Sequence, residues 1–235
     1  MQKLLLCLLV IAASAHASQE VRVAVATNFR VTLEQLNPAF ESSTSIRVIL
    51  SSGSTGGLYH QILSGAPYDI FLAADRISID RLVEKLSAQP ATNFCYARGK
   101  LALVGGDRSL HQLADPSMSV AIANPVTAPY GQAATEVLAS PEFAMGSERQ
   151  LVRGSNAMQA YQYWYTGNVD LALVPLSLAG SSGTLIPKDW YSAIEQHALL
   201  LPASQAKPAA QAYINWLNSP ETRAKITAAG YDPCP

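Results

Sequence analysis

Short apolar runs alternate with amphipathic helical patterns along this chain, and that alternation constrains its fold more than any other feature. The first three runs, residues 21–26, 46–50 and 69–73, are β-branched or continuously apolar, as expected for strands covered on both faces. Between the first two, apolar residues such as Phe29 and Leu33 recur at helical spacing. A series of this kind predicts a parallel sheet with right-handed crossovers.

A second series of the same kind follows and predicts a second α/β lobe. Its strands and helices are expected at residues 101–104, 119–123 and 170–174, and at residues 132–139 and 156–165. A loop at residues 89–93 leads from one series to the next, and residues 198–201 are predicted to form a return strand. We therefore expect one lobe from residues 18–98 and 201–235, and a second lobe from residues 99–200.

The N-terminal segment, residues 1–17, has the pattern of a secretory signal peptide. Lys3 precedes an apolar run at residues 4–13, and Ala15 and Ala17 form a small-x-small cleavage site. The run is too short to span a membrane as a helix, so we expect cleavage near Ala17 and a soluble, periplasmic protein. Cys7 lies deep in the run without small residues before it, which disfavours a lipoprotein.

The charge, the cysteines and the histidines bear on nucleic-acid binding, disulfide formation and metal binding. Sixteen basic and 17 acidic residues give a formal net charge of −1, which argues against nucleic-acid binding. Outside the signal peptide only Cys95 and Cys234 remain, and in an exported protein this even count favours a disulfide, with two free thiols as the alternative. The histidines are scattered without metal-ligand spacing, so no metal-cation site is expected.

Polar, uncharged residues occur between the end of a predicted strand and the start of the next predicted helix. These junctions are residues 26–28, 52–57, 128–131 and 154–157. Ligands of open parallel sheets bind beyond the carboxyl ends of the strands, and helix N-termini present unpaired N–H groups with a partial positive charge. Four such junctions could hold an anion without a Lys or Arg. At any single junction, Ser, Thr or Asn could instead be a simple N-cap.

Catalysis has little support in the sequence, and no enzymatic activity or cofactor is expected. The chain lacks a nucleophile elbow, a phosphate-binding loop with its lysine and a dinucleotide fingerprint. His60 follows Ser54 at a distance that could suggest a hydrolase, but it has no acidic partner to orient it. Asp75 is expected to cap the following helix, and the aromatic residues 161–165 are expected to pack rather than form a ligand platform.

The junction residues carry a resemblance to a known family. The segments VRVAVATNF, SSGSTGGLYHQILSGAPYDIFLAAD, ANPVTAPYGQAA and GSNAMQAYQ are similar to those of the periplasmic molybdate-binding proteins of ABC-type transporters. The resemblance covers essentially the whole chain after the signal peptide. It implies an α/β, two-lobe type II periplasmic-binding-protein fold with parallel-rich sheets and the ligand cleft between the lobes. It also implies a monomer that binds molybdate or tungstate and a membrane permease as partner.

The same resemblance implies the ligand-binding residues, which are Thr27, Asn28, Ser54, Thr55, Tyr130 and Ala157. Many members have a tyrosine whose hydroxyl binds the ligand at the place of Pro175, which has neither a hydroxyl nor an N–H. The Thr-Asn and Pro-Tyr-Gly segments resemble a branch in which the tyrosine of Pro-Tyr-Gly, here Tyr130, supplies the hydroxyl. No junction contains Asp or Glu, which suits an unprotonated oxyanion better than phosphate. Sulfate, or another small anion or organic ligand, is the alternative.

Overall fold

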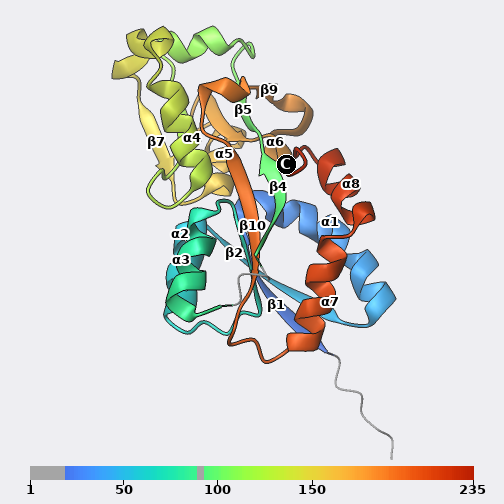
Figure 1. The fold of residues 1–235 in the computed structure, drawn as a ribbon. Coiled ribbons are helices and arrows are strands. Elements are labelled where there is room, and N and C mark those ends of the chain that lie inside the picture. The colour runs from blue at the N-terminus through green and yellow to red at the C-terminus, as the bar shows by residue number, and fades with distance from the viewer. Residues whose placement is uncertain (1–18, 89–92) are drawn as a thin grey trace, which may run out of the picture.

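The computed structural model describes residues 19–88 and 93–235, which form two α/β lobes, one above the other in Figure 1. The predicted signal peptide lies outside these residues, as does most of the loop expected at residues 89–93. The two series of strands and helices predicted two lobes, and each lobe contains a five-stranded sheet. No helix among the described residues is long and apolar enough to cross a membrane.

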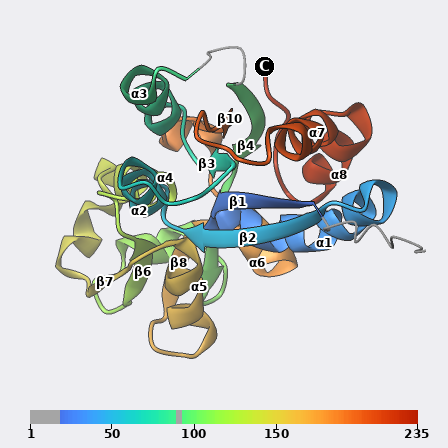
Figure 2. The same ribbon diagram turned by 90° about the horizontal axis from the view of Figure 1, so that it is seen from below.

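The first sheet has the strand order β2-β1-β3-β10-β4. Its strands are β1 (Glu20–Ala26), β2 (Arg47–Gly53), β3 (Ile70–Ala73), β4 (Phe94–Gly99) and β10 (Ile194–Leu200). Its helices are α1 (Thr27–Thr44), α2 (Thr55–Leu63), α3 (Ile77–Leu86), α7 (Lys207–Leu217) and α8 (Pro220–Ala228). Helices α2 and α3 lie on one side of the sheet and α1, α7 and α8 on the other (Figure 2).

The second sheet has the strand order β7-β6-β8-β5-β9. Its strands are β5 (Leu101–Gly105), β6 (Val120–Ala123), β7 (Leu151–Gly154), β8 (Leu171–Pro175) and β9 (Thr184–Leu185). Its α-helices are α4 (Pro129–Leu138), α5 (Ala157–Tyr165) and α6 (Leu176–Ala179). Short 3₁₀ segments occupy Leu110–Ala114, Pro141–Glu148, Gly180–Ser182 and Lys188–Trp190.

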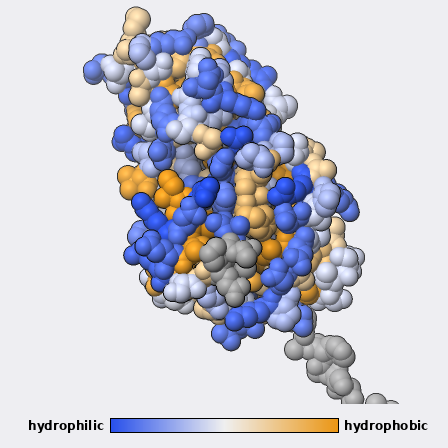
Figure 3. Space-filling model, viewed as in Figure 1, coloured by the Kyte–Doolittle hydropathy of each residue, from blue (hydrophilic) through white to orange (hydrophobic). Residues whose placement is uncertain are grey.

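Apolar side chains cover both faces of each sheet, which explains the continuously apolar strands. In β1, Val21, Val23 and Val25 pack with α1 and α7, whereas Ala24 packs with α2 and α3. This alternation is the period of two that a strand imposes on its side chains. On the face shown in Figure 3, the surface is mostly hydrophilic, and hydrophobic residues gather near the junction of the lobes.

Both sheets are mixed rather than wholly parallel. The pairs β1–β2, β1–β3, β6–β7 and β6–β8 are parallel, but β10 runs antiparallel to β3 and β4, and β5 runs antiparallel to β8 and β9. The antiparallel strands include β4, β5 and β10, which flank the two passages of the chain between the lobes. The parallel strands still end at one edge of each sheet, so the predicted junctions keep their place.

Strand β10 corrects the expected lobe boundary. Residues up to 200 were expected in the second lobe, but Ile194–Leu200 pairs with β3 and β4 in the first sheet. An apolar run identifies a strand without identifying its partners, and for this reason the boundary was placed too late. The chain therefore returns to the first sheet before Ile194.

The C-terminus is tied to the junction of the lobes, and the predicted disulfide is present. Cys95 in β4 is bonded to Cys234, with their Cα atoms 6.0 Å apart and a sequence separation of 139. Arg98 and Asp232 exchange backbone hydrogen bonds, both 2.9 Å long. The Asp232 carboxylate also pairs with Lys100, at the passage between lobes, and with Lys188 of the second lobe.

Candidate functional site

The predicted ligand-binding residues all lie at helix N-termini that follow strands or short loops. Thr27 and Asn28 begin α1 directly after β1, and Thr55 begins α2 with Ser54 as its N-cap. Because Ala26 pairs with Gly53 in the parallel register, these two helix starts lie side by side. In the second lobe, Tyr130 is the second residue of α4 and Ala157 is the first of α5.

Contacts between the lobes bring these helix starts together. The Gly56 N–H donates to the Thr127 carbonyl across the junction at 2.9 Å, and a Cβ on Gly56 would lie only 3.1 Å from the Thr127 Cα. Ala26 shares an apolar cluster with Tyr130, and Ala157 shares another with Ala128, at the start of α4. The predicted residues therefore form one region at the junction, with the lobes in contact.

Three hydroxyl groups in this region accept hydrogen bonds and retain their own protons as donors. The Ser54 Oγ accepts from the Gly57 N–H at 3.3 Å, and the Thr55 Oγ1 accepts from the Ala74 N–H at 3.0 Å. The Tyr130 hydroxyl accepts from the Gln196 Nε2 at 3.3 Å. In the part of the chain that the structure describes, none of these hydroxyls donates to a protein acceptor. A hydroxyl has one proton to donate, so each remains able to bind an acceptor.

Backbone donors add to these hydroxyls. Within the described residues, the first-turn N–H groups of Asn28, Thr55, Tyr130 and Ala157 have no protein acceptor. The first N–H groups of an α-helix lack intrahelical partners and carry the positive end of the helix dipole. Asn28, Thr55, Tyr130 and Ala157 are also at most 4% exposed, so their N–H groups need a partner other than bulk water.

The Asn28 side chain faces the strands between the lobes. Its Nδ2 donates to the Gln196 Oε1 at 2.8 Å and to the Tyr231 hydroxyl at 3.4 Å. Its amide protons are therefore occupied within the protein, and the backbone N–H is the donor that remains. Thr27 is buried beside it, and no side-chain hydrogen bond is found for it among the described residues.

The tyrosines of the region stay neutral near physiological pH. Burial raises the pKa of Tyr130 well above its usual value, and the neighbouring hydroxyls of Tyr231 and Tyr96 add to the shift. Burial likewise raises the pKa of Tyr231, to about 12. A neutral hydroxyl keeps the proton that makes it a donor.

Sequence reasoning missed Gln196, Tyr96 and Tyr231, which connect to the predicted residues. Tyr96 lies in β4, Gln196 in β10 and Tyr231 near the C-terminus, far in sequence from the helix starts. No local motif marks them. The one available signal was polar residues within otherwise apolar segments.

The catalytic alternative depended on His60, which follows Ser54 in the sequence. His60 is exposed on α2, where its ring lies 5.3 Å from that of Tyr59, in the wall of a 470 Å³ cavity between the lobes that Asp75 and Arg81 also line. Asp75 accepts from the Ser78 N–H at 2.6 Å, as a residue that caps α3 does. Among the described residues, no group of three or more His, Cys, Asp or Glu could hold a metal ion.

The aromatic residues of α5 pack as expected. Tyr161 stacks on Tyr165 with ring centroids 5.9 Å apart, and Trp164 packs against Tyr161. Tyr161, Tyr163 and Trp164 lie against the apolar cluster that includes β5 and β8. These packing contacts explain the position of the aromatic residues of α5 without a ligand.

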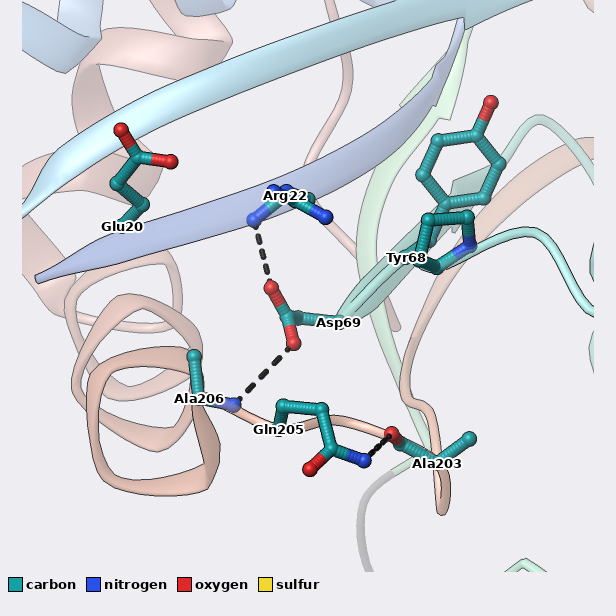
Figure 4. Close-up of a pocket in the computed structure, with 8 residues that line it drawn as sticks. Glu20, Arg22, Tyr68, Asp69, Ala203, Gln205 and Ala206 are labelled. Atoms are coloured by element: carbon teal, nitrogen blue, oxygen red, sulfur yellow. Dashed lines mark hydrogen bonds between the residues drawn. The ribbon is translucent and has the colours of Figure 1, made fainter.

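A second pocket, of 260 Å³, lies at the end of the first sheet that is far from the junction of the lobes. Figure 4 shows the residues that line it. Its central carboxylate, Asp69, accepts from the Arg22 N–H at 2.8 Å and from the Ser204 Oγ at 2.6 Å. Glu20 at this pocket and Ala26 at the junction are six residues apart along β1, which corresponds to about 20 Å. This pocket is therefore separate from the candidate site. The hydrogen bonds of Asp69 with Ser204 and Ala206 hold the loop before α7.

Two mixed α/β lobes, joined by crossing strands and meeting at a cluster of helix N-termini, define the class of two-lobe solute-binding proteins. This class matches the fold predicted from the sequence. The chain belongs to the family of bacterial extracellular solute-binding proteins, whose model matches residues 21–232.

The sequence is also similar to those of two curated solute-binding proteins. The chain is 38% identical over 232 residues to the molybdate-binding protein ModA of Azotobacter vinelandii, covering 93% of this chain and 92% of that protein. It is 36% identical over 224 residues to the molybdate-binding protein ModA of Rhodobacter capsulatus, covering 92% and 89%.

Solved structures show the same fold. The periplasmic molybdate-binding protein of Azotobacter vinelandii matches with a TM-score of 0.84 and 32% identity, covering 92% of this chain and 100% of that chain. The sulfate-binding protein SubI of Mycobacterium tuberculosis H37Rv matches with a TM-score of 0.74 and 18% identity, covering 92% and 87%. At that identity, the second likeness shows the fold alone.

Proposed function

We propose that this protein captures molybdate or tungstate and delivers it to the membrane permease of an ABC importer. The observation that carries the proposal is a cluster of helix N-termini that offers hydroxyl and N–H donors, with no carboxylate among the predicted ligand-binding residues. The two curated relatives, named as molybdate-binding proteins, support the same ligand.

The donors divide into two kinds. The hydroxyls of Ser54, Thr55 and Tyr130 bind the oxyanion through protons that no described protein group accepts. The backbone N–H groups of Asn28, Thr55, Tyr130 and Ala157 bind it through helix N-termini, as anions are bound at such ends. Thr27, buried at the start of α1, completes the wall of the site.

The Thr-Asn and Pro-Tyr-Gly segments assign the tyrosine hydroxyl to Tyr130. Pro175 ends β8 and has no hydroxyl or N–H to donate, so a donor must come from elsewhere. Tyr130 is buried, neutral and hydrogen-bonded as an acceptor, so its proton remains for the ligand.

Chemistry separates the candidate anions. Molybdate, tungstate and sulfate are unprotonated dianions at neutral pH, whereas phosphate retains a proton that needs an acceptor. The shorter bonds of sulfate would leave some donors without a partner, at about 1–3 kcal/mol for each buried donor. Sulfate is therefore the second candidate, bound more weakly.

The remaining features follow from this function. We propose a monomer that is exported to the periplasm with its signal peptide removed near Ala17, and that binds its ligand without a cofactor or catalytic step. Closure of the two lobes on the anion presents the surface that the permease recognises.

A thermal-shift and calorimetric panel tests the proposal. Protein freed of anions by unfolding and refolding is titrated with molybdate, tungstate, sulfate and phosphate at equal ionic strength. A thousandfold excess over Kd stabilises the bound form by about 4 kcal/mol, so molybdate and tungstate are expected to raise the Tm by several degrees. A larger shift with sulfate or phosphate would contradict the assigned ligand, and no shift with any of the four would contradict the oxyanion class.

A further inference from the structure

Gln196 connects the two lobes through a buried hydrogen-bond network. It lies in β10 and is fully buried, next to the point where the register between β10 and β4 shifts. A shift of this kind re-aims side chains locally. Its amide contacts Asn28 and Tyr96 of the first lobe and Tyr130 of the second.

The direction of each hydrogen bond in this network can be assigned from one end. The single proton of the Tyr231 hydroxyl has two acceptors, the Asn28 carbonyl at 2.7 Å and the Ser177 Oγ at 2.9 Å. With either acceptor, the Tyr231 oxygen accepts from the Asn28 Nδ2 at 3.4 Å. The other proton of that Nδ2 faces the Gln196 Oε1 at 2.8 Å. A carbonyl oxygen only accepts, which fixes the orientation of the Gln196 amide.

That orientation decides what Tyr130 can do. The Tyr96 hydroxyl lies 3.0 Å from the Gln196 Oε1 and 3.2 Å from the Ala73 carbonyl, which are the two acceptors for its one proton. The Gln196 Nε2 faces the Tyr130 hydroxyl at 3.3 Å. An amide N–H only donates, so the Tyr130 oxygen accepts and its proton must point elsewhere. Gly99 makes room for this contact, because a Cβ there would lie 2.1 Å from the Tyr130 hydroxyl oxygen.

We propose that Gln196 is a positioning residue that turns the Tyr130 proton toward the bound oxyanion. It does not contact the anion. It holds the Tyr130 oxygen as an acceptor and so makes the hydroxyl a donor in the closed protein. This inference rests on the function proposed above, because it assigns the origin of one of the donors.

A double-mutant cycle tests the inference. Gln196→Met keeps the length of the side chain and removes both amide groups, and Tyr130→Phe removes the hydroxyl. Molybdate Kd is measured by calorimetry for the wild type, both single variants and the double variant. Gln196→Met is expected to weaken binding about tenfold in the wild-type background and less than twofold in the Tyr130→Phe background, since the donor it positions is then absent.

Tyr213→Phe is the matched control, because it removes a buried tyrosine hydroxyl that donates to the Asn37 Oδ1 at 2.8 Å, outside the Gln196 network. It is expected to change Kd less than twofold. Equal weakening by Gln196→Met in both backgrounds would overturn the inference and indicate a general packing role. A lowered Tm of ligand-free Gln196→Met does not prevent the cycle from distinguishing the positioning role from a packing role, because a packing defect weakens binding in both backgrounds. Failure of the wild type to bind molybdate would instead overturn the proposed function.

Discussion

Tyr130 is the single side chain on which the donor set depends most. In our proposal, its hydroxyl is the side-chain donor of the second lobe, because Ala157 has only its N–H to donate and Pro175 has neither a hydroxyl nor an N–H. Replacing Tyr130 by Phe retains the buried ring and removes one hydrogen bond to a charged acceptor. Because such bonds contribute about 1.5–3 kcal/mol, molybdate Kd should rise at least tenfold in a calorimetric titration.

The matched control is Tyr165→Phe, since Tyr165 lies exposed at the end of α5. Its Kd should equal that of the wild type. An unchanged Kd for Tyr130→Phe would place the hydroxyl donor at another residue.

Thr55 combines a structural role with the proposed binding role. Its Oγ1 accepts from the Ala74 N–H, and its proton is directed to the ligand in our proposal. Thr55→Val should therefore both lower the Tm of the ligand-free protein and weaken molybdate binding, because a buried N–H loses its partner and the anion loses a donor. Thr55→Ser retains the hydroxyl and should bind within about threefold of the wild type. Equal weakening by both substitutions would show that loss of the hydroxyl is not what weakens binding.

The sequence predicted those strands and helices that are marked by a local pattern of apolar residues. The apolar runs and helical spacing located most strands and helices, and the junctions after β1 and β2 and before α4 and α5 were identified as helix starts. Strand β4 was missed because half of its residues are polar or small, and β7 was missed because its apolar residues are only Leu151 and Val152, followed by Arg153 and Gly154. The partners of β10 were missed because strand pairing depends on contacts distant in sequence.

The same distinction applies to the site. Ser54 and Thr55 lie in one motif and could be found together, whereas Gln196 meets Asn28 across 168 residues. A glutamine inside an apolar strand has no motif of its own. Its role became visible only when β4, β10 and the C-terminal segment were placed beside the helix starts.

The C-terminal segment predicts a pH dependence of stability. Burial alone would raise the pKa of Asp232, but hydrogen bonds and charge from Lys188 and Lys100 outweigh it and lower the pKa below its usual value. The stability gained from this carboxylate is therefore fully present above about pH 3.9, the ordinary pKa of Asp, and is lost as pH falls through the lowered value.

Asp232→Asn tests this dependence by urea denaturation between pH 3 and pH 7. The variant should be less stable than the wild type at pH 7, and the difference should shrink as the pH falls below about 4. Glu221→Gln, which removes an exposed pair with Lys225 in α8, should have little effect at pH 7. A constant difference between Asp232→Asn and the wild type across the range would show that the carboxylate charge is not responsible.

For the whole molecule, the fold explains how neutral groups could hold a dianion. Parallel strands end at the junction of the lobes and are followed by helices, and the two lobes meet there through the contact of Gly56 with Thr127. In our proposal, the partial charges of these helix N-termini act together on the bound anion, without the desolvation cost of burying a lysine or arginine. The disulfide and the Asp232 pairs attach the end of the chain to the same junction.

X-ray diffraction from crystals grown with molybdate, recorded on both sides of the molybdenum absorption edge, tests the central claim most directly. The account predicts one strong anomalous peak between the lobes, with oxygens within hydrogen-bond distance of the Ser54, Thr55 and Tyr130 hydroxyls and of the Asn28 and Ala157 N–H groups. A peak bound by lysine or arginine side chains, or the absence of a peak at the junction, would contradict it.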